Sequence, residues 1–350
     1  MPTWSELGKE LDEARADESV LPNHEYDHVR RKHLVNLSQY TKRDTILYAT
    51  NWTHGSVPDP YMISINDEDI QGLMEVVHGL KKDKLDLILH SPGGTVEAAE
   101  AIVQYLRKKF VHIRAIIPQA AMSAATMIAC GCDEIVMGKQ SSLGPIDPQV
   151  ILAGRHDAIP TQDILDQFEL AQEQCMDPDL LGSWLPILGS YGPGLLVQCK
   201  NAQALSKQLA AKWLRENMFK DLGKEERSRR ASKVARWLAS HTSHKSHSRH
   251  LDRDALEAKG LKIINLEDDQ RFQDLALTVF HAVNHTFNGT QAMKIIENHN
   301  GRCFVRSVRM LTFNPIQMAG PIPTGPSVPL VPVQLPATPQ EDEPEVSSPE

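Results

Sequence analysis

The 350-residue chain has little cysteine and few aromatic residues: five cysteines, none in a CxxC pair, and 5% Phe, Trp and Tyr. This scarcity excludes a disulfide scaffold and predicts free thiols in a reducing compartment. No apolar run approaches the ~18 residues of a membrane-spanning helix, and the charged N-terminus does not resemble a signal peptide. Acids outnumber bases by 45 to 37, which argues against a dedicated nucleic-acid partner. We therefore expect a cytoplasmic protein without a membrane anchor.

Proline and acidic residues concentrate at the C-terminal end of the chain. Residues 314–350 hold ten of the 22 prolines and five acids but no base, so they contribute −5 to the net charge of −8. Such a segment buries too little apolar surface to offset the entropy lost on ordering. It predicts a disordered, proline-rich, acidic tail, which is either a solvated extension or a docking segment for a partner.

The rest of the chain alternates strand-like and helix-like stretches. Leu85–His90 is nearly all apolar, as expected of a parallel strand that is covered on both faces. Similar alternation along residues 44–137 predicts an α/β fold with parallel strand–helix units and right-handed crossovers. Helical patterns dominate after residue 160. We expect a helical N-terminal arm (residues 1–43), one α/β domain with a helical C-terminal half (44–313) and the tail (314–350).

Three turns that follow predicted strands could carry chemistry. The glycines of Ser91–Gly94 can point bare N–H groups at an anion, although any strand-to-helix turn uses glycine. Ser123 begins a small-residue helix, as in a nucleophile elbow, but alanines replace the usual GxSxG glycines and close packing also explains them. Asp147, in a turn-rich loop, is either an acid that orients a base or a turn residue.

Four histidines recur at three-residue steps in the segment SHTSHKSHSRH, at positions 241, 244, 247 and 250. The pattern is open to three interpretations: a general base, a transition-metal site or a solvated loop. No Cys or Glu accompanies the histidines at ligand spacing, which disfavours a metal.

Taken together in this order and spacing, the three turns resemble the Clp-fold serine peptidases, and especially their serine dehydrogenase proteinase branch. The likeness lies in ILHSPGGTVEAAEAI, AMSAATMIA, DEIVMG and SSLGPIDPQ, and in a later block with HTFNGT and KIIENHNGR. The resemblance implies a Clp/crotonase-like fold and a serine endopeptidase, a hydrolase that acts on proteins or peptides. It also implies a homo-oligomer and a reaction that needs no metal or organic cofactor.

The resemblance also implies roles for single residues. Ser123 would be the nucleophile, the N–H groups of Gly94 and Ala124 would form the oxyanion hole, and Asp147 would orient the base. His247 aligns best with the family's histidine. The alternative bases are His250, Lys139 and Lys200.

Two other functions are compatible with the same fold. One is a non-catalytic oligomeric scaffold that presents the proline-rich tail to partners. The other is an acyl-CoA enzyme, which would use turn amides as an oxyanion hole but would need acid/base carboxylates instead of a serine nucleophile.

Overall fold

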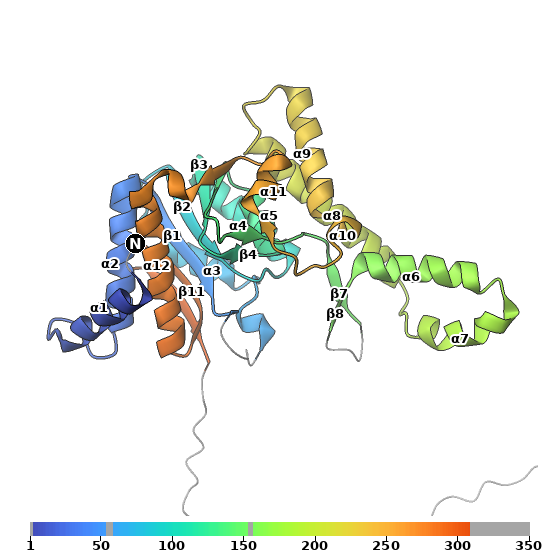
Figure 1. Cartoon of the computed structure of the whole chain (residues 1–350), viewed down its shortest axis with the longest axis horizontal. Coiled ribbons are helices and arrows are strands. Elements are labelled where there is room, and N and C mark those ends of the chain that lie inside the picture. Colours follow the sequence, from blue (N-terminus) through green and yellow to red (C-terminus); the bar gives the residue numbers. More distant parts are fainter. Residues whose placement is uncertain (1–2, 54–58, 153–156, 309–350) are drawn as a thin grey trace, which may run out of the picture. The chain divides into compact units, whose positions relative to one another are not determined.

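A seven-stranded sheet organises the computed structural model, which describes residues 3–53, 59–152 and 157–308; the predicted tail lies outside this range. The strand order is β10-β5-β3-β2-β1-β11-β12 (Figure 1). Neighbours from β10 to β1 are parallel, whereas β11 pairs antiparallel with β1 and with β12. The strands are β1 (Asp44–Thr50), β2 (Lys84–His90), β3 (His112–Ile117), β5 (Glu134–Met137), β10 (Ile263–Asn265), β11 (Ala292–Asn298) and β12 (Cys303–Ser307).

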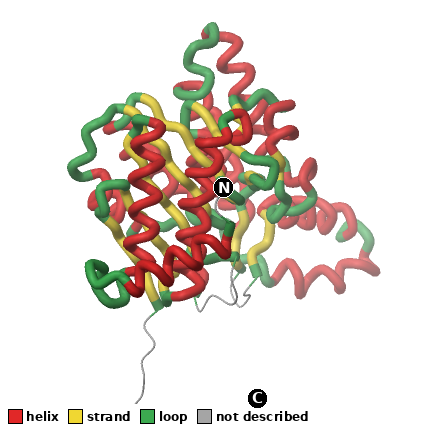
Figure 2. The backbone as a smooth tube through the Cα atoms, turned by 60° about the vertical axis from the view of Figure 1, so that its left-hand side comes forward, coloured by secondary structure: helices red, strands yellow, loops and turns green. Residues whose placement is uncertain are grey.

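Helices cover both faces of this sheet, and strand residues alternate between the two resulting cores. In β1, Ile46 and Tyr48 pack into one apolar cluster, whereas Leu47 and Ala49 pack into the other. Helices α2 (Glu25–Thr41) and α12 (Gln270–Gly289) line the second cluster, and Figure 2 shows helices lying across the strands. The first cluster is covered by α3 (Asp69–Val77), α4 (Val96–Lys109), α5 (Ala124–Cys130), α8 (Leu195–Glu216) and α9 (Lys224–Leu238). The predicted α/β class, with a parallel-rich sheet and a helical C-terminal half, is confirmed.

The N-terminal helices pack on the body. Helix α1 (Trp4–Ala16) contacts α2, and α2 lies along α12. Arg30 of α2 is fully buried and pairs with the buried carboxylate of Glu297 in β11. Because removal of one partner of a buried ion pair leaves an uncompensated charge, this contact ties α2 firmly to the sheet.

Two smaller sheets extend from the large one. The first has the order β4-β6-β9 and consists of β4 (Ala120–Ala121), β6 (Ser142–Leu143) and β9 (Leu251–Asp252). The second is the hairpin of β7 (Gln149–Ile151) and β8 (Ala158–Pro160), which leads into α6 (Thr161–Gln174) and α7 (Pro178–Gly189). Helix α6 packs against α8 through an apolar cluster of its own, which contains Ile164, Leu195 and Cys199.

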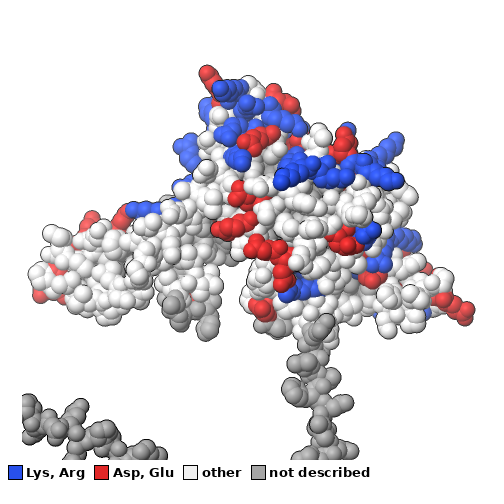
Figure 3. Space-filling view, turned by 180° about the vertical axis from the view of Figure 1, so that it is seen from behind, with Lys and Arg blue, Asp and Glu red and all other residues white. Residues whose placement is uncertain are grey.

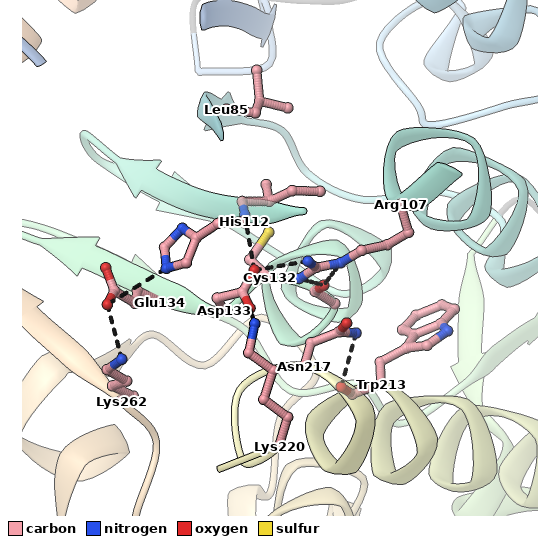
Figure 4. A network of polar contacts seen from close by, with 12 residues as sticks. Leu85, Arg107, His112, Cys132, Asp133, Glu134, Trp213, Asn217, Lys220 and Lys262 are labelled. Atoms are coloured by element: carbon pink, nitrogen blue, oxygen red, sulfur yellow. Dashed lines mark hydrogen bonds and ion pairs between the residues drawn. The ribbon is translucent and has the colours of Figure 1, made fainter. Parts of the chain in front are cut away.

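A buried carboxylate fastens the helical half to the beginning of β5. Asp133 accepts hydrogen bonds from Arg107 of α4 at 2.7 Å, from Lys220 after α8 at 2.6 Å and from the Ile113 N–H at 2.8 Å (Figure 4). Burial raises the pKa of the Asp133 carboxyl, but Lys220, the Ile113 amide and Arg107 outweigh it, so the pKa lies below the ordinary aspartate value. The network joins the sheet, α4 and the end of α8 at one point.

Charge is unevenly distributed over the helical half. Helix α9 carries six bases, and Figure 3 shows Lys and Arg side chains gathered at the end of the molecule that contains α9. Helices α6 and α7 carry no base. The net charge of −8 therefore conceals a basic helical end. Within the described residues, no helix combines the length and apolar character needed to cross a membrane.

Candidate active site

Ser123 lies at a sharp turn between β4 and α5. Its backbone angles are φ 50° and ψ −117°, a conformation that residues with a side chain rarely adopt. Ser123 is partly exposed, whereas its neighbours Met122 and Ala124 are buried. The Thr126 hydroxyl fixes the turn from within, because it lies 2.8 Å from the Ala121 carbonyl oxygen and accepts from the Gly144 N–H. The turn thus presents a hydroxyl from an otherwise buried segment.

The glycine turn after β2 packs directly against Ser123. Gly93 has φ +102°, and a Cβ there would lie 2.7 Å from both the Met122 carbonyl oxygen and the Ser123 Cβ. At Gly94, a Cβ would come within 2.1 Å of the Ile65 carbonyl oxygen. Only glycine allows these approaches. In the described part of the chain, the N–H groups of Gly94 and Ala124 donate no backbone hydrogen bond in the loops and caps around them.

Asp147 is held in a loop whose backbone is tied to three elements. The Gly144 N–H donates to Ala121 of β4, the Ile146 N–H donates to Leu238 at the end of α9, and the Thr161 N–H of α6 donates to Pro148. Asp147 is buried, with only 4% of its side-chain surface exposed. These bonds fix the position of the carboxylate relative to the serine turn.

Two histidines converge on Asp147 from a short turn that follows α9. His247 Nδ1 lies 2.9 Å from Asp147 Oδ1, and His241 Nδ1 lies 2.9 Å from Asp147 Oδ2. His241 begins the single-turn helix α10 (His241–His244), which Ser240 caps. Lys245 then adopts φ +64°, and this left-handed residue ends the turn and sends the chain back toward Asp147.

Strand pairing explains why these distant residues meet. Ala121 of β4 pairs with Leu143 of β6, and Leu143 pairs with Leu251 of β9. Because β4 and β6 are parallel, Ser123 and Asp147 both follow the same end of this small sheet. Strand β9 runs in the opposite direction, so His247, four residues before Leu251, lies at that end as well.

The aspartate is ionised in this environment. Burial raises the pKa of the Asp147 carboxyl, but the hydrogen bonds and charges of His247 and then His241 outweigh it. The pKa therefore lies below the ordinary aspartate value. An ionised carboxylate accepts from each Nδ1–H, which leaves Nε2 of His247 as the nitrogen able to take a proton.

The other predicted bases lie elsewhere. His250 is exposed, and its Nδ1 is 2.6 Å from the Ser142 hydroxyl rather than close to Asp147. Lys139 and Lys200 are exposed to solvent, whereas a lysine that acts as a base is buried away from water. Among the described residues, no hydrogen bond joins the Ser123 hydroxyl to any of the four histidines.

The four histidines have four different sets of partners. His244 is buried with Nε2 2.7 Å from the Trp237 carbonyl oxygen, and burial lowers the pKa of this imidazole. In the described ranges, no group of three or more His, Cys, Asp or Glu side chains is arranged to hold a metal ion.

The second histidine on Asp147 was not predicted as a site residue. His241 and His244 both belong to the regular three-residue spacing, and nothing in the sequence distinguishes the one that contacts Asp147. The difference arises because His244 contacts the carbonyl oxygen and the ring of Trp237 instead. The partner of His241 at its second nitrogen, Asp163 of α6, was likewise missed.

A strained serine at a strand-to-helix turn, beside bare amides and an aspartate–histidine pair, has the features of a serine hydrolase. Residues 51–181 match the model of the ClpP-like SDH-type serine proteinase family. The resemblance expected from the sequence is thereby confirmed over the segment that contains Gly94, Ser123 and Asp147. His241 and His247 lie beyond the matched segment.

Two curated relatives are uncharacterized proteins of Methanocaldococcus jannaschii. One is 41% identical over 87 residues, which cover 25% of this chain and 30% of the relative. The other is 34% identical over 118 residues, 33% of this chain and 38% of the relative. The chain thus spans about a third of the length of these curated relatives.

Solved structures similar to this chain include two of a membrane-bound stomatin-specific protease, 1510-N. The first is 16% identical with a TM-score of 0.35, and it covers 61% of this chain and 79% of its own. The second, with a bound substrate peptide, is 14% identical with a TM-score of 0.24, covering 57% and 84%. Scores this low support no argument about the site.

Proposed function

We propose that this protein is a serine endopeptidase in which Ser123 is the nucleophile, His247 the base and Asp147 the acid that orients it. The observation that carries the proposal is the 2.9 Å hydrogen bond between His247 Nδ1 and the buried Asp147 carboxylate, at the sheet end where Ser123 turns outward. The family match supports a serine peptidase, and a protease family implies peptide substrates.

The reaction follows from the protonation states at the site. With its Nδ1–H donated to Asp147, His247 takes the Ser123 hydroxyl proton on Nε2 while the oxygen attacks the peptide carbonyl. The amide N–H groups of Gly94 and Ala124 stabilise the resulting oxyanion. His247 then gives the proton to the leaving amine, and water hydrolyses the acyl-serine by the same steps in reverse order. No step requires a metal or organic cofactor.

The Ser123–His247 hydrogen bond forms in this proposal when substrate is bound. Catalytic hydrogen bonds are often long in free enzymes and shorten in the substrate complex. The proposal favours His247 over the alternatives because His250, Lys139 and Lys200 make no contact with Asp147, and both lysines are exposed.

Two further features belong to the proposal. A cytoplasmic location is supported by the five cysteines, all of which are free thiols. A homo-oligomer is expected because the fold resembles peptidases that enclose their active sites by assembly.

A fluorophosphonate probe tests the proposal directly, because it labels only an activated serine. Wild type should be labelled, Ser123→Ala should not, and His247→Ala should lose labelling by about 10³-fold or more. Labelling that persists in Ser123→Ala would refute the nucleophile. If labelling is lost in His250→Ala but retained in His247→Ala, the base is His250 and not His247. Absence of labelling in a folded, assembled wild type would favour the scaffold.

A further inference from the structure

Both oxygens of the Asp147 carboxylate are occupied by imidazoles. Oδ1 accepts from His247 and Oδ2 from His241, each at 2.9 Å. An orienting aspartate needs a donor on its second oxygen to keep the first in the plane of the base. His241 supplies that donor from the turn that also leads to His247.

The second nitrogen of His241 also faces a carboxylate. Its Nε2 lies 3.1 Å from Oδ1 of Asp163, which belongs to α6. The His241 side chain is 13% exposed and the Asp163 side chain 50% exposed. Asp147 and Asp163 thus place a carboxylate beside each nitrogen of the same imidazole, and both would attract a positive charge on that ring.

We infer that His241 is a positioning residue that holds Asp147 in place and, when protonated with the help of Asp163, moderates the charge that Asp147 exerts on His247. This inference rests on the proposed function, because it assigns His247 as the base. It adds a second histidine and an acid of α6 to the residues that control the reaction.

The direction of the effect follows from the charges. A positive His241 offsets part of the negative charge of Asp147, so His247 holds its proton less strongly and remains available as a base at lower pH. Loss of the positive charge should therefore move the acidic limb of the pH–rate profile to higher pH. The titratable and charged groups around His241 are Asp147 from the loop after β6, Asp163 from α6, His244 on its own helix, and His247 and Arg249 from the following segment.

Three variants separate the effect of His241 on the position of Asp147 from the effect of the charge on His241. His241→Asn keeps an N–H donor near Asp147 but removes the charge, His241→Ala removes both, and Asp163→Asn removes only the outer carboxylate. Glu169→Gln, an exposed acid on the same helix, is the matched control. The readouts are the pH dependence of kcat/KM on a peptide substrate and an NMR titration of the His247 ring.

The expected results differ among the variants. His241→Asn should move the acidic limb and the His247 titration midpoint up by about one pH unit, and Asp163→Asn by roughly half as much. Glu169→Gln should move neither. His241→Ala should lose about tenfold in plateau kcat with little change in KM, and His241→Asn should retain more of that rate.

Two outcomes would overturn the inference. One is a pair of profiles for His241→Asn and Asp163→Asn that superimpose on wild type. The other is an equal shift in Glu169→Gln, which would indicate a general effect of net charge. The NMR titration keeps this test separate from the proposed function. If Ser123→Ala abolishes peptide hydrolysis but the His247 titration midpoint does not move in His241→Asn, only the role of His241 is disproved. Persistence of activity in Ser123→Ala refutes the proposed mechanism itself.

Discussion

Two buried aspartates, Asp133 and Asp147, lie at opposite ends of the strands and have opposite kinds of partner. Asp133 precedes β5 and is bound by Arg107 and Lys220, whose charges are permanent at physiological pH. Asp147 follows β6 and is bound by two histidines, the side chain that changes charge near neutral pH. Both carboxyls have a pKa below the ordinary aspartate value. A lowered pKa therefore does not distinguish Asp133 from the proposed orienting acid Asp147, whereas the chemical type of their partners does.

Replacement of the proposed orienting acid, Asp147, should produce the largest difference between the two sites. Asp147→Asn should lower kcat by about 10⁴-fold, because the amide favours the wrong histidine tautomer. Asp133→Asn should leave kcat per folded molecule within about threefold, since Asp133 lies at the other end of the strands. Hydrolysis of a fluorogenic peptide measures both. Comparable losses of kcat in the two variants would contradict the assignment of different roles to Asp147 and Asp133.

Stability should show the reverse order. Asp133→Ala leaves the half-buried Arg107 without its counter-ion and the Ile113 N–H without its side-chain acceptor, and it should lower the free energy of unfolding by about 3 kcal/mol. Lys220 adds little to this figure because its side chain is 40% exposed. The exposed pair of Arg302 and Glu75 is the control, and Glu75→Ala should have a far smaller effect. Urea unfolding measures both variants, and a loss in Asp133→Ala no larger than in the control would show that the network is not structural.

Acid should weaken both sites by the same mechanism. The pKa of Asp133 is lower in the folded protein than in the unfolded chain, so its contribution to stability is complete above the ordinary aspartate pKa. That contribution is lost as the pH falls through the lower folded value. Below about pH 4 the unfolding free energy should therefore decline less steeply in Asp133→Asn than in wild type. Parallel declines would show that Asp133 does not contribute.

The smallest effect is expected at His250. His250→Ala removes a contact with the Ser142 hydroxyl but no contact with Asp147, so the rate of fluorophosphonate labelling should change by less than about threefold. Time-resolved labelling against wild type provides the measurement. A loss as large as that in His247→Ala would make His250 the base.

Local patterns predicted much of the fold. The expected strand Leu85–His90 corresponds to β2, because a nearly all-apolar run is suited to burial on both faces of the sheet. The antiparallel strand β11 was missed. Its sequence contains Lys294, Glu297 and Asn298, which look like surface residues. These three are buried because Asp69, Arg30 and the Val76 carbonyl neutralise or bind them, and such partners are not visible in a local pattern.

Some residues of the candidate site could likewise be predicted from local sequence, and others could not. Gly93, Gly94 and Ser123 were recognisable because the turns themselves require small residues, and a positive φ at Gly93 agrees with that reasoning. His241 was not recognisable, because its contacts depend on how α10 packs against the loop that holds Asp147 and against α6. Helix α7 was also missed, since Pro186 interrupts its pattern.

The pairing of β9 with β6 has a consequence for synthesis of the protein. The serine turn and Asp147 are complete once about 150 residues have left the ribosome, but the segment with His247 is anchored only when Leu251 pairs with Leu143. A nascent chain that ends before β9 therefore exposes a serine without its proposed base. Under the proposed mechanism, this order of the elements delays assembly of the active site until the segment that ends at β9 has been synthesised.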